Sequence, residues 1–312
     1  MTTSSSQYND RLCALLWSLW TELGASGWNA GNPDRAIDPE PLIIATAALS
    51  DLDPRLHDEA VDWCIRYGHF VSGARLRNLI ARAPESVQHA YGEFAATVAA
   101  HSTLRWPGAT HLRNYRPTGR SEIRDFSKGS LIVLRLRALF GVGARSEIVK
   151  IFLSRPEEAF IASALSTPAG YSKRNVADAL ESLCQGGLLE STSVHNQIHY
   201  RLKSQKELKQ FVGLQPMDFP DWTLIFPLFI FLRDLIQQTE LLAEPVREVE
   251  IKTALKNMVN IIRPARFPDP PSKTIGVGFW TNFFAWTLNL IGACLTPLFQ
   301  NEGRHKAYTR GK

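Results

Sequence analysis

The chain has 312 residues, of which 45% are hydrophobic and 21% are charged. These are ordinary globular values, and they exclude a wholly disordered chain and a collagen-like fibre. A chain of this length is expected to form two or three domains. The net charge of +5 is too small for a histone-like tail, so its distribution along the chain is more informative than its total.

The four cysteines indicate a reducing compartment. Cys13, Cys64, Cys184 and Cys294 are too far apart for a C-x-x-C metal pair and too few to staple a small secreted fold. The N-terminal sequence MTTSSSQYND also lacks the basic start of an export signal. We therefore expect four reduced core cysteines in a cytoplasmic protein.

Residues 1–106 carry helical patterns throughout and show no alternation typical of strands. Apolar residues recur at three- and four-residue intervals at Leu12, Leu15, Leu16, Leu19 and Leu23, which predicts an amphipathic helix. Asp38-Pro39 and Asp53-Pro54 each have the form of a helix start, an N-cap followed by proline. Further helices are expected from Ser72 to Pro84 and from Val87 to His101. We interpret this region as an all-helical N-terminal domain.

Residues 107–130 form a linker or extended arm rich in Arg, Gly and Pro, within a basic zone. From Arg105 to Lys150 ten basic residues face three acidic ones, whereas residues 33–106 have a net charge of −3. Such asymmetry is typical of a nucleic-acid-binding module beside a partner-binding module. A solvated linker that happens to be Arg-rich fits the charge equally well. As an arm, the segment offers four arginines for phosphate contacts: Arg113, Arg116, Arg120 and Arg124.

Residues 131–212 predict helices followed by a two-stranded hairpin. Short helices are expected from Leu131, from Ser146 and from Phe160 to Leu165. Ser172 is a good N-cap for a helix from Lys173 to Gln185, and Gly186-Gly187 ends that helix. A strand then begins at Leu188, a turn follows in which Asn196 suits a positive φ, and Ile198 to Leu202 alternates as a return strand.

The run from Ser172 to Leu189, SKRNVADALESLCQGGLL, resembles the recognition helix and wing entry of bacterial winged-helix regulators of the MarR and ArsR type. Their pattern, S-x-x-x-V-x-x-x-L-x-x-L-x-x-x-G-L-[VIL], is matched at Ser172, Val176, Leu180, Leu183, Gly187, Leu188 and Leu189. The resemblance covers about 75–80 residues, roughly Leu131 to Leu208. It implies a mainly α fold in which helical N- and C-terminal domains flank a central winged helix-turn-helix with a two-stranded β-wing.

The resemblance also implies which residues contact DNA. In that family the exposed start of the second helix enters the major groove. By position, Lys173, Arg174 and Asn175 would face bases or phosphates, with Ala177 and Asp178 one turn later, while Tyr171 and Ser172 would touch the DNA backbone. The wing would place His195, Asn196, His199 and Arg201 near the minor groove or phosphates. Asp178 departs from the expected chemistry, since a carboxylate near DNA repels phosphate. It would instead accept from a cytosine amine or point to solvent.

Residues 213–312 predict an apolar helical C-terminal domain with a basic tail. Trp222 to Leu232 carries no charge, and Pro227 within it predicts a kink or a late helix start. A further helix is expected from Val246 to Ile262. Residues 276–299 are long enough to span a bilayer, but their Thr and Asn content favours a helix buried in a soluble domain. A membrane or amphipathic surface helix is the alternative.

The motifs of common enzymes are absent from the sequence. It contains no Walker loop, no G-x-G-x-x-G after a strand and no G-x-S-x-G. His195 and His199 lack nearby metal ligands other than Glu190, so we expect neither a metal nor a cofactor. We predict a non-enzymatic, cytoplasmic transcriptional regulator that binds double-stranded DNA.

Useful specificity usually needs two half-sites, so we expect a homodimer. The flanking domains would dimerise or receive a signal from a small effector or protein partner. Three alternatives are open. The first is a docking module for a protein, as in an antitoxin-like or phage-defence accessory protein. The others are an RNA-binding module and a membrane-tethered regulator.

Overall fold

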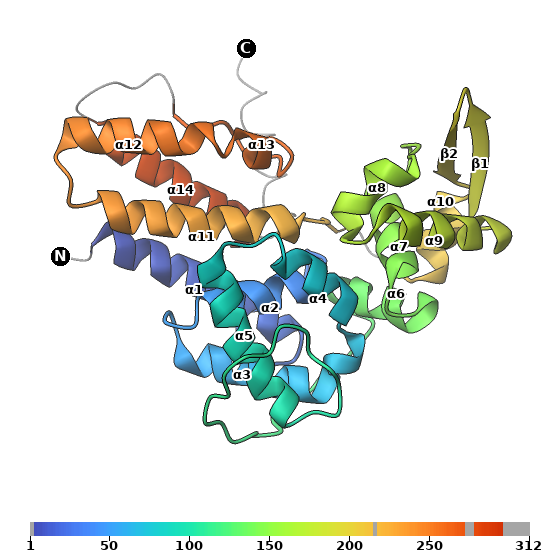
Figure 1. Ribbon diagram of the computed structural model, residues 1–312, viewed down its shortest axis with the longest axis horizontal. Helices are drawn as coiled ribbons and strands as arrows, with labels where there is room; N and C mark the ends of the chain where they lie inside the picture. The colour runs from blue at the N-terminus through green and yellow to red at the C-terminus, as the bar shows by residue number, and fades with distance from the viewer. Residues whose placement is uncertain (1–2, 215–216, 272–277, 296–312) are drawn as a thin grey trace, which may run out of the picture.

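The computed structural model describes residues 3–214, 217–271 and 278–295. Within these ranges the chain is mainly helical, with fourteen α-helices and one two-stranded antiparallel sheet. Figure 1 shows two parts, a large group of helices and a smaller group that carries the sheet at one end of the molecule. The mainly α class expected from the sequence is therefore confirmed.

The large part, here called the helical body, combines helices from both ends of the chain. Its helices are α1 (Ser4–Glu22), α2 (Pro39–Ala48), α3 (Pro54–Tyr67), α4 (Gly73–Ile80), α5 (Glu85–Ala100), α11 (Trp222–Thr239), α12 (Glu244–Lys256), α13 (Val259–Ile262) and α14 (Phe279–Leu295). Helix α1 packs against α11 and α14, and α2 packs against α11. Fully buried Tyr8 donates a hydrogen bond to the carbonyl oxygen of Phe229 over 3.1 Å.

This shared core corrects the sequence-based division into two flanking helical domains. Residues of α1 to α5 and of α11 to α14 belong to one continuous hydrophobic cluster. The reason is that the buried residues of α1 are not confined to its leucine stripe, because Trp17 and Trp20 are buried as well. A helix buried on so much of its surface needs partners on more than one side, and the C-terminal helices supply them.

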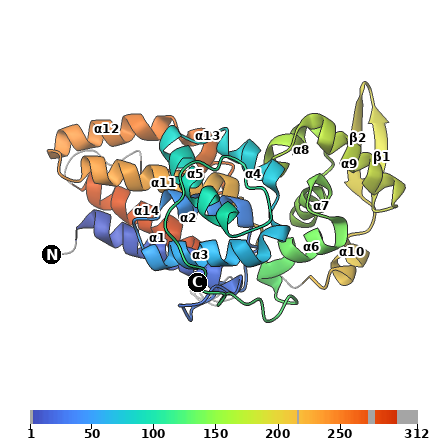
Figure 2. The same ribbon diagram turned by 60° about the horizontal axis from the view of Figure 1, so that its bottom comes forward.

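The smaller part, here called the hairpin unit, spans residues 132–214 and has a core of its own. Its elements are α6 (Ile132–Phe140), α7 (Ala144–Ser154), α8 (Ala162–Ala169), α9 (Lys173–Gln185), β1 (Leu189–Val194), β2 (Gln197–Leu202) and α10 (Gln205–Phe211). In both views the β1–β2 hairpin projects away from the helical body (Figures 1 and 2).

Several element boundaries differ from expectation. Phe160 does not begin a helix, because its backbone exchanges two hydrogen bonds with Tyr200, of 2.8 and 2.9 Å, at the edge of the hairpin. Helix α8 continues through Pro168 to Ala169, and its C-cap is Gly170, whose φ of +73° suits glycine. Helix α11 likewise runs through Pro227 from Trp222. The single helix expected over 246–262 is divided into α12 and α13.

Helix α14 accounts for most of the apolar stretch at 276–299. It has 17 residues, and its buried side chains, such as Phe283 and Ile291, pack in the core of the helical body. No helix in the described part of the chain is long and apolar enough to cross a membrane. Residues 276–277 and 296–299, like the basic tail, lie outside the described residues.

Candidate functional site

The N-terminal turn of α9 presents polar and cationic side chains to solvent. Ser172 caps the helix, since its Oγ accepts the backbone N–H of Asn175 over 3.2 Å. Val176, Leu180 and Leu183 face the core of the hairpin unit, as their spacing predicted. Lys173, Arg174, Asn175 and Asp178 are exposed, and Ala177 is half-buried. The structure therefore brings together the residues predicted for this turn.

The charge of α9 changes sign along its exposed face. Lys173 and Arg174 occupy the first turn, and neither has an ion-pair partner among the described residues. One and two turns later the exposed residues are Asp178 and Glu181. The first turn thus combines two cations with the positive end of the helix dipole, whereas the middle of the helix is acidic.

The hairpin has a two-residue turn, His195 and Asn196, because Val194 pairs with Gln197. His195, not Asn196 as expected, takes the positive φ of 54°. Both turn residues and Arg201 are exposed, and His199 is half-buried. The tip also exposes Val194 and Ile198, which are 43% and 51% accessible. The hairpin is therefore a mixed apolar and polar projection with modest positive charge.

The turn between α8 and α9 lies against α4 of the helical body. Asn78 donates through Nδ2 to the carbonyl oxygen of Gly170 over 2.9 Å, and Arg75 donates through Nε to that of Ala169 over 3.1 Å. The hydroxyls of Tyr171 and Ser72 share a hydrogen bond of 2.6 Å, and burial raises the pKa of Tyr171 to about 12. Tyr171 is buried, which corrects the expectation that it is available to touch DNA.

Behind this contact, six charged side chains join the two parts of the molecule, five of them buried and one, Lys150, half-buried. The helical body contributes Asp38, Glu40 and Arg75, and the hairpin unit contributes Arg137, Glu147 and Lys150. Arg75 pairs with Asp38 and with Glu40, whose Oε2 lies 2.6 Å from Nη1. Three cations balance three carboxylates, so the cluster is electrically neutral.

Arg137 and Lys150 complete the connection across this cluster. Arg137 contacts Glu40 and Glu147 through Nη2, each over 2.6 Å, and Lys150 lies 2.8 Å from Asp38 and 2.5 Å from Glu147. Burial alone would raise the pKa of Glu147, but Arg75, Lys150 and Arg137 together lower it to about 2. The same balance between burial and neighbouring cations holds the pKa of Asp38 well below its usual range. Both carboxylates are therefore charged at neutral pH.

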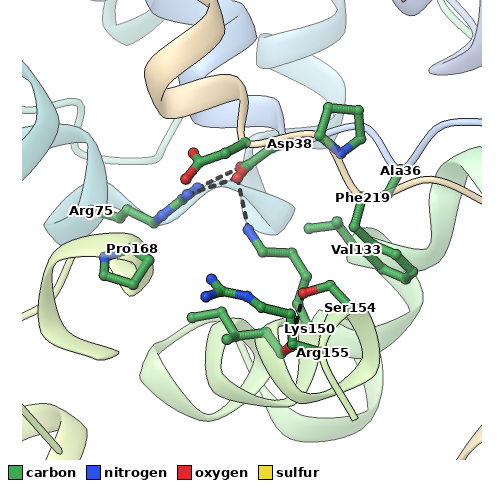
Figure 3. A pocket seen from close by; sticks show the side chains of 12 residues that line it. Ala36, Asp38, Arg75, Val133, Lys150, Ser154, Arg155, Pro168 and Phe219 are labelled. Atoms are coloured by element: carbon green, nitrogen blue, oxygen red, sulfur yellow. Dashed lines mark hydrogen bonds and ion pairs between the residues drawn. The ribbon is translucent and has the colours of Figure 1, made fainter. Parts of the chain in front are cut away.

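Figure 3 shows the edge of this cluster, where Lys150 and Arg75 converge on Asp38 beside a small cavity. The cavity measures about 50 Å³, which admits a few water molecules and no larger ligand. A wider cleft of about 1140 Å³ opens nearby between the two parts, with Arg155, Phe219 and Phe267 in its lining. Its size allows a small molecule, but its lining does not define a ligand chemistry.

Segment 107–130 lies on the helical body alongside α3 and α5 in both views. The carboxylate of Asp62 accepts backbone N–H groups of Thr118, Gly119 and Ser121 over 2.7 to 3.2 Å. Arg113 is half-buried and contacts Asp58 over 3.2 Å. The segment is thus a docked strap in which Arg116, Arg120 and Arg124 are exposed, and not an extended arm.

The buried charge cluster was missed by sequence reasoning. The pair Asp38-Pro39 predicts a helix cap, but the Asp38 side chain caps nothing and instead pairs with Arg75. A usable signal was present in α6, where Arg137 follows Leu134 by three residues and so falls on the apolar face. A charge on a buried face requires a buried partner, although its identity cannot be read from spacing.

The described residues show neither of two other common kinds of chemistry, metal ligation and disulfide bonding. They contain no group of three or more His, Cys, Asp or Glu side chains arranged to hold a metal ion, and all four cysteines are free. Comparisons with protein-family models, with curated proteins and with solved structures find no match for this chain. The residues of the hairpin unit and their geometry are therefore the basis on which a function is inferred.

Proposed function

We propose that the hairpin unit is a winged helix-turn-helix and that the protein is a sequence-specific DNA-binding transcriptional regulator. Three features of the unit support this. Helices α7, α8 and α9 precede the hairpin, Phe160 pairs with the hairpin edge, and the hairpin projects beside α9. This is the element order that the MarR and ArsR resemblance implies. In this proposal α9 is the recognition helix and the hairpin is the wing.

The observation that carries the proposal is the exposed first turn of α9. Arg174 can make a bidentate contact to guanine and Asn175 to adenine, while Lys173 suits a phosphate. Ser172 and the hairpin residues His195, Asn196, His199 and Arg201 would contribute backbone or groove contacts. We assign Asp178 no attractive contact, since a carboxylate near DNA repels phosphate.

A fluorescence-anisotropy titration tests this proposal. The probes are a random-sequence duplex and a duplex from upstream of the protein's own gene, each titrated at 50 and 200 mM salt. We expect binding that weakens steeply with salt and that a Lys173→Ala/Arg174→Ala variant loses. Lys256→Ala/Arg263→Ala removes the same charge from α12 and the chain after α13, and should bind normally. Equal loss in both variants, or no binding by folded wild type, would contradict the proposal.

We further propose that the protein acts as a homodimer, because a single recognition helix reads too few base pairs for useful specificity. Sedimentation-velocity measurements at micromolar protein test this. A dimer bound to a duplex with two half-sites one helical turn apart is expected. A monomer bound to a single half-site with undiminished specificity would contradict it.

A second candidate function is protein docking through the hairpin unit. The specific observations in its favour are the acidic stripe Asp178 and Glu181 and the exposed apolar tip at Val194 and Ile198. Neither feature attracts DNA, and exposed apolar side chains are typical of a surface that a protein covers. Salt separates the two candidates, because docking through an apolar tip depends weakly on ionic strength and should be lost in Ile198→Ser.

A further inference from the structure

The wide cleft between the helical body and the hairpin unit is lined by residues of both parts. The hairpin unit contributes Leu153, Arg155 and Lys209 among others, and the helical body contributes Arg266 and Phe267. The volume of about 1140 Å³ compares with roughly 300–1,000 Å³ for typical small-molecule pockets. A molecule that fills this cleft contacts both parts of the structure.

The carboxylates of the lining are already occupied. The charged lining residues are four cations and two carboxylates, Arg35, Arg155, Lys209, Arg266, Asp218 and Asp221. Taken as a whole, this lining is of mixed charge. However, Asp221 accepts the backbone N–H of Thr223 over 3.1 Å as the cap of α11, and Asp218 lies 3.9 Å from Arg35. Neither carboxylate is therefore the main group that a ligand would meet.

Two of the four cations differ from the others in having no partner. Arg155 lies 3.7 Å from Glu158 and also over the ring of Phe160. Lys209 is half-buried on α10, and Arg266 is exposed in the chain after α13. Within the described residues, neither of these two side chains has an ion pair or a hydrogen bond. The charge available to a ligand in the cleft is therefore positive, which favours an anion.

The backbone at Arg266 is an independent indication of a binding role. Its φ of +60° lies in the left-handed region, where a side chain other than glycine is strained. The amide of Arg266 donates to the carbonyl of Arg263 over 3.0 Å, and the next amide donates to that of Ile262 over 3.3 Å. This is the helix-ending position that glycine normally takes. An arginine here costs free energy relative to glycine, and strained residues of this kind cluster at ligand-binding sites.

Most of the remaining lining is apolar. It includes Leu214, Met217, Phe219, Leu224 and Phe267. Phe219 also lines the small cavity of Figure 3, so that cavity adjoins the cleft. Apolar walls stabilise the hydrocarbon part of a ligand by removing it from water. The cleft therefore combines an apolar wall with two cations that lack partners.

We propose that this cleft binds a small anionic molecule with an apolar body, such as an aromatic carboxylate or sulfonate. Lys209 and Arg266 bind the anionic part, and the apolar lining contacts the body. Because such a ligand contacts the hairpin unit and the helical body together, its binding stabilises the folded protein. The inference is independent of the proposed DNA binding, since it uses no residue of α9 or of the hairpin.

Fluorescence titration with two related probes tests this inference. Anilinonaphthalene sulfonate is anionic, and N-phenylnaphthylamine has the same rings without the sulfonate. We expect wild type to bind one molecule of the anionic probe, and Lys209→Met and Arg266→Gly each to weaken this binding about tenfold. Binding of the neutral probe should change by less than about twofold. Lys206→Met and Arg263→Ala are the matched controls, because they remove cations of the same two segments that lie outside the lining, and they should bind both probes normally.

Three further readouts separate binding from folding and fix the class of ligand. Naphthoate should displace the anionic probe and raise the melting temperature of wild type. Inorganic phosphate at the same ionic strength should do neither, because it has no apolar body. Arg266→Gly should melt at or above the temperature of wild type, because glycine adopts the positive φ without strain.

Equal binding of the anionic probe by wild type and by both cleft variants would overturn the inference. An equal loss of both probes would also overturn it, because the cations would then act on the shape of the cleft and not on an anion. Displacement by phosphate alone, or failure of folded wild type to bind the anionic probe, would contradict the proposed ligand.

Discussion

Replacing Arg137 by methionine should destabilise the protein more than any surface substitution. The Arg137 side chain is 1% exposed, and it donates to Glu40, Glu147 and the carbonyl oxygen of Phe70, each over 2.6 Å. Methionine keeps much of the volume but leaves two fully buried carboxylates short of a partner. Removing one member of a buried ion pair costs about 3–5 kcal/mol. The whole free energy of unfolding of a domain is only about 5–15 kcal/mol.

Urea unfolding followed by circular dichroism at pH 7 measures this free energy. Arg135→Met is a matched control on the same helix, since Arg135 is half-buried, donates to the carbonyl of Ser127 over 3.0 Å and pairs with no carboxylate of the described residues. We expect the control to change stability by less than about 1 kcal/mol. If Arg137→Met costs no more than Arg135→Met, the cluster does not hold the two parts together and the reasoning is refuted.

Three further predictions follow from the same contacts. Glu147, with a pKa of about 2 when folded and an ordinary value near 4.5 when unfolded, contributes about 3 kcal/mol above pH 5 that is lost as the pH falls toward 2. The melting temperature of Glu147→Gln should therefore depend less on pH across this range than that of wild type. An equal pH dependence in the two proteins would contradict the lowered pKa of Glu147. Tyr171→Phe removes the hydrogen bond to Ser72 and should lower the free energy of unfolding, measured in urea, by about 1 kcal/mol. An unchanged free energy would show that the hydroxyl is solvated. Asp62→Ala frees three backbone amides of segment 107–130 and should speed hydrogen exchange there but not in α11; uniform exchange would argue against the docked strap.

Local features of this fold follow directly from the sequence. Ser172 was expected to cap a helix, and its Oγ does so; Val176, Leu180 and Leu183 were expected to share a buried face, and they do. These predictions succeed because capping and helical periodicity depend only on residues within one or two turns. The two-stranded hairpin was predictable for the same reason, since its strands are close in sequence.

Long-range features were not predictable from spacing. The union of α1 to α5 with α11 to α14 in one core depends on contacts between residues more than two hundred positions apart, such as Tyr8 and Phe229. An apolar face indicates that a helix packs against another element, but it does not identify that element. The burial of Tyr171 was unpredictable for the same reason, and so were the partners of Arg137. Both depend on how the hairpin unit packs against the helical body.

The central claim, that DNA contacts the first turn of α9, is tested most directly by site-specific photo-crosslinking. A photoreactive phenylalanine analogue at position 175 should crosslink to a labelled duplex, and the yield should fall when salt is raised from 50 to 200 mM. The same analogue at exposed Thr253 on α12 should give no crosslink. Crosslinking at 253 but not at 175, under conditions in which the protein binds the duplex, would contradict the account.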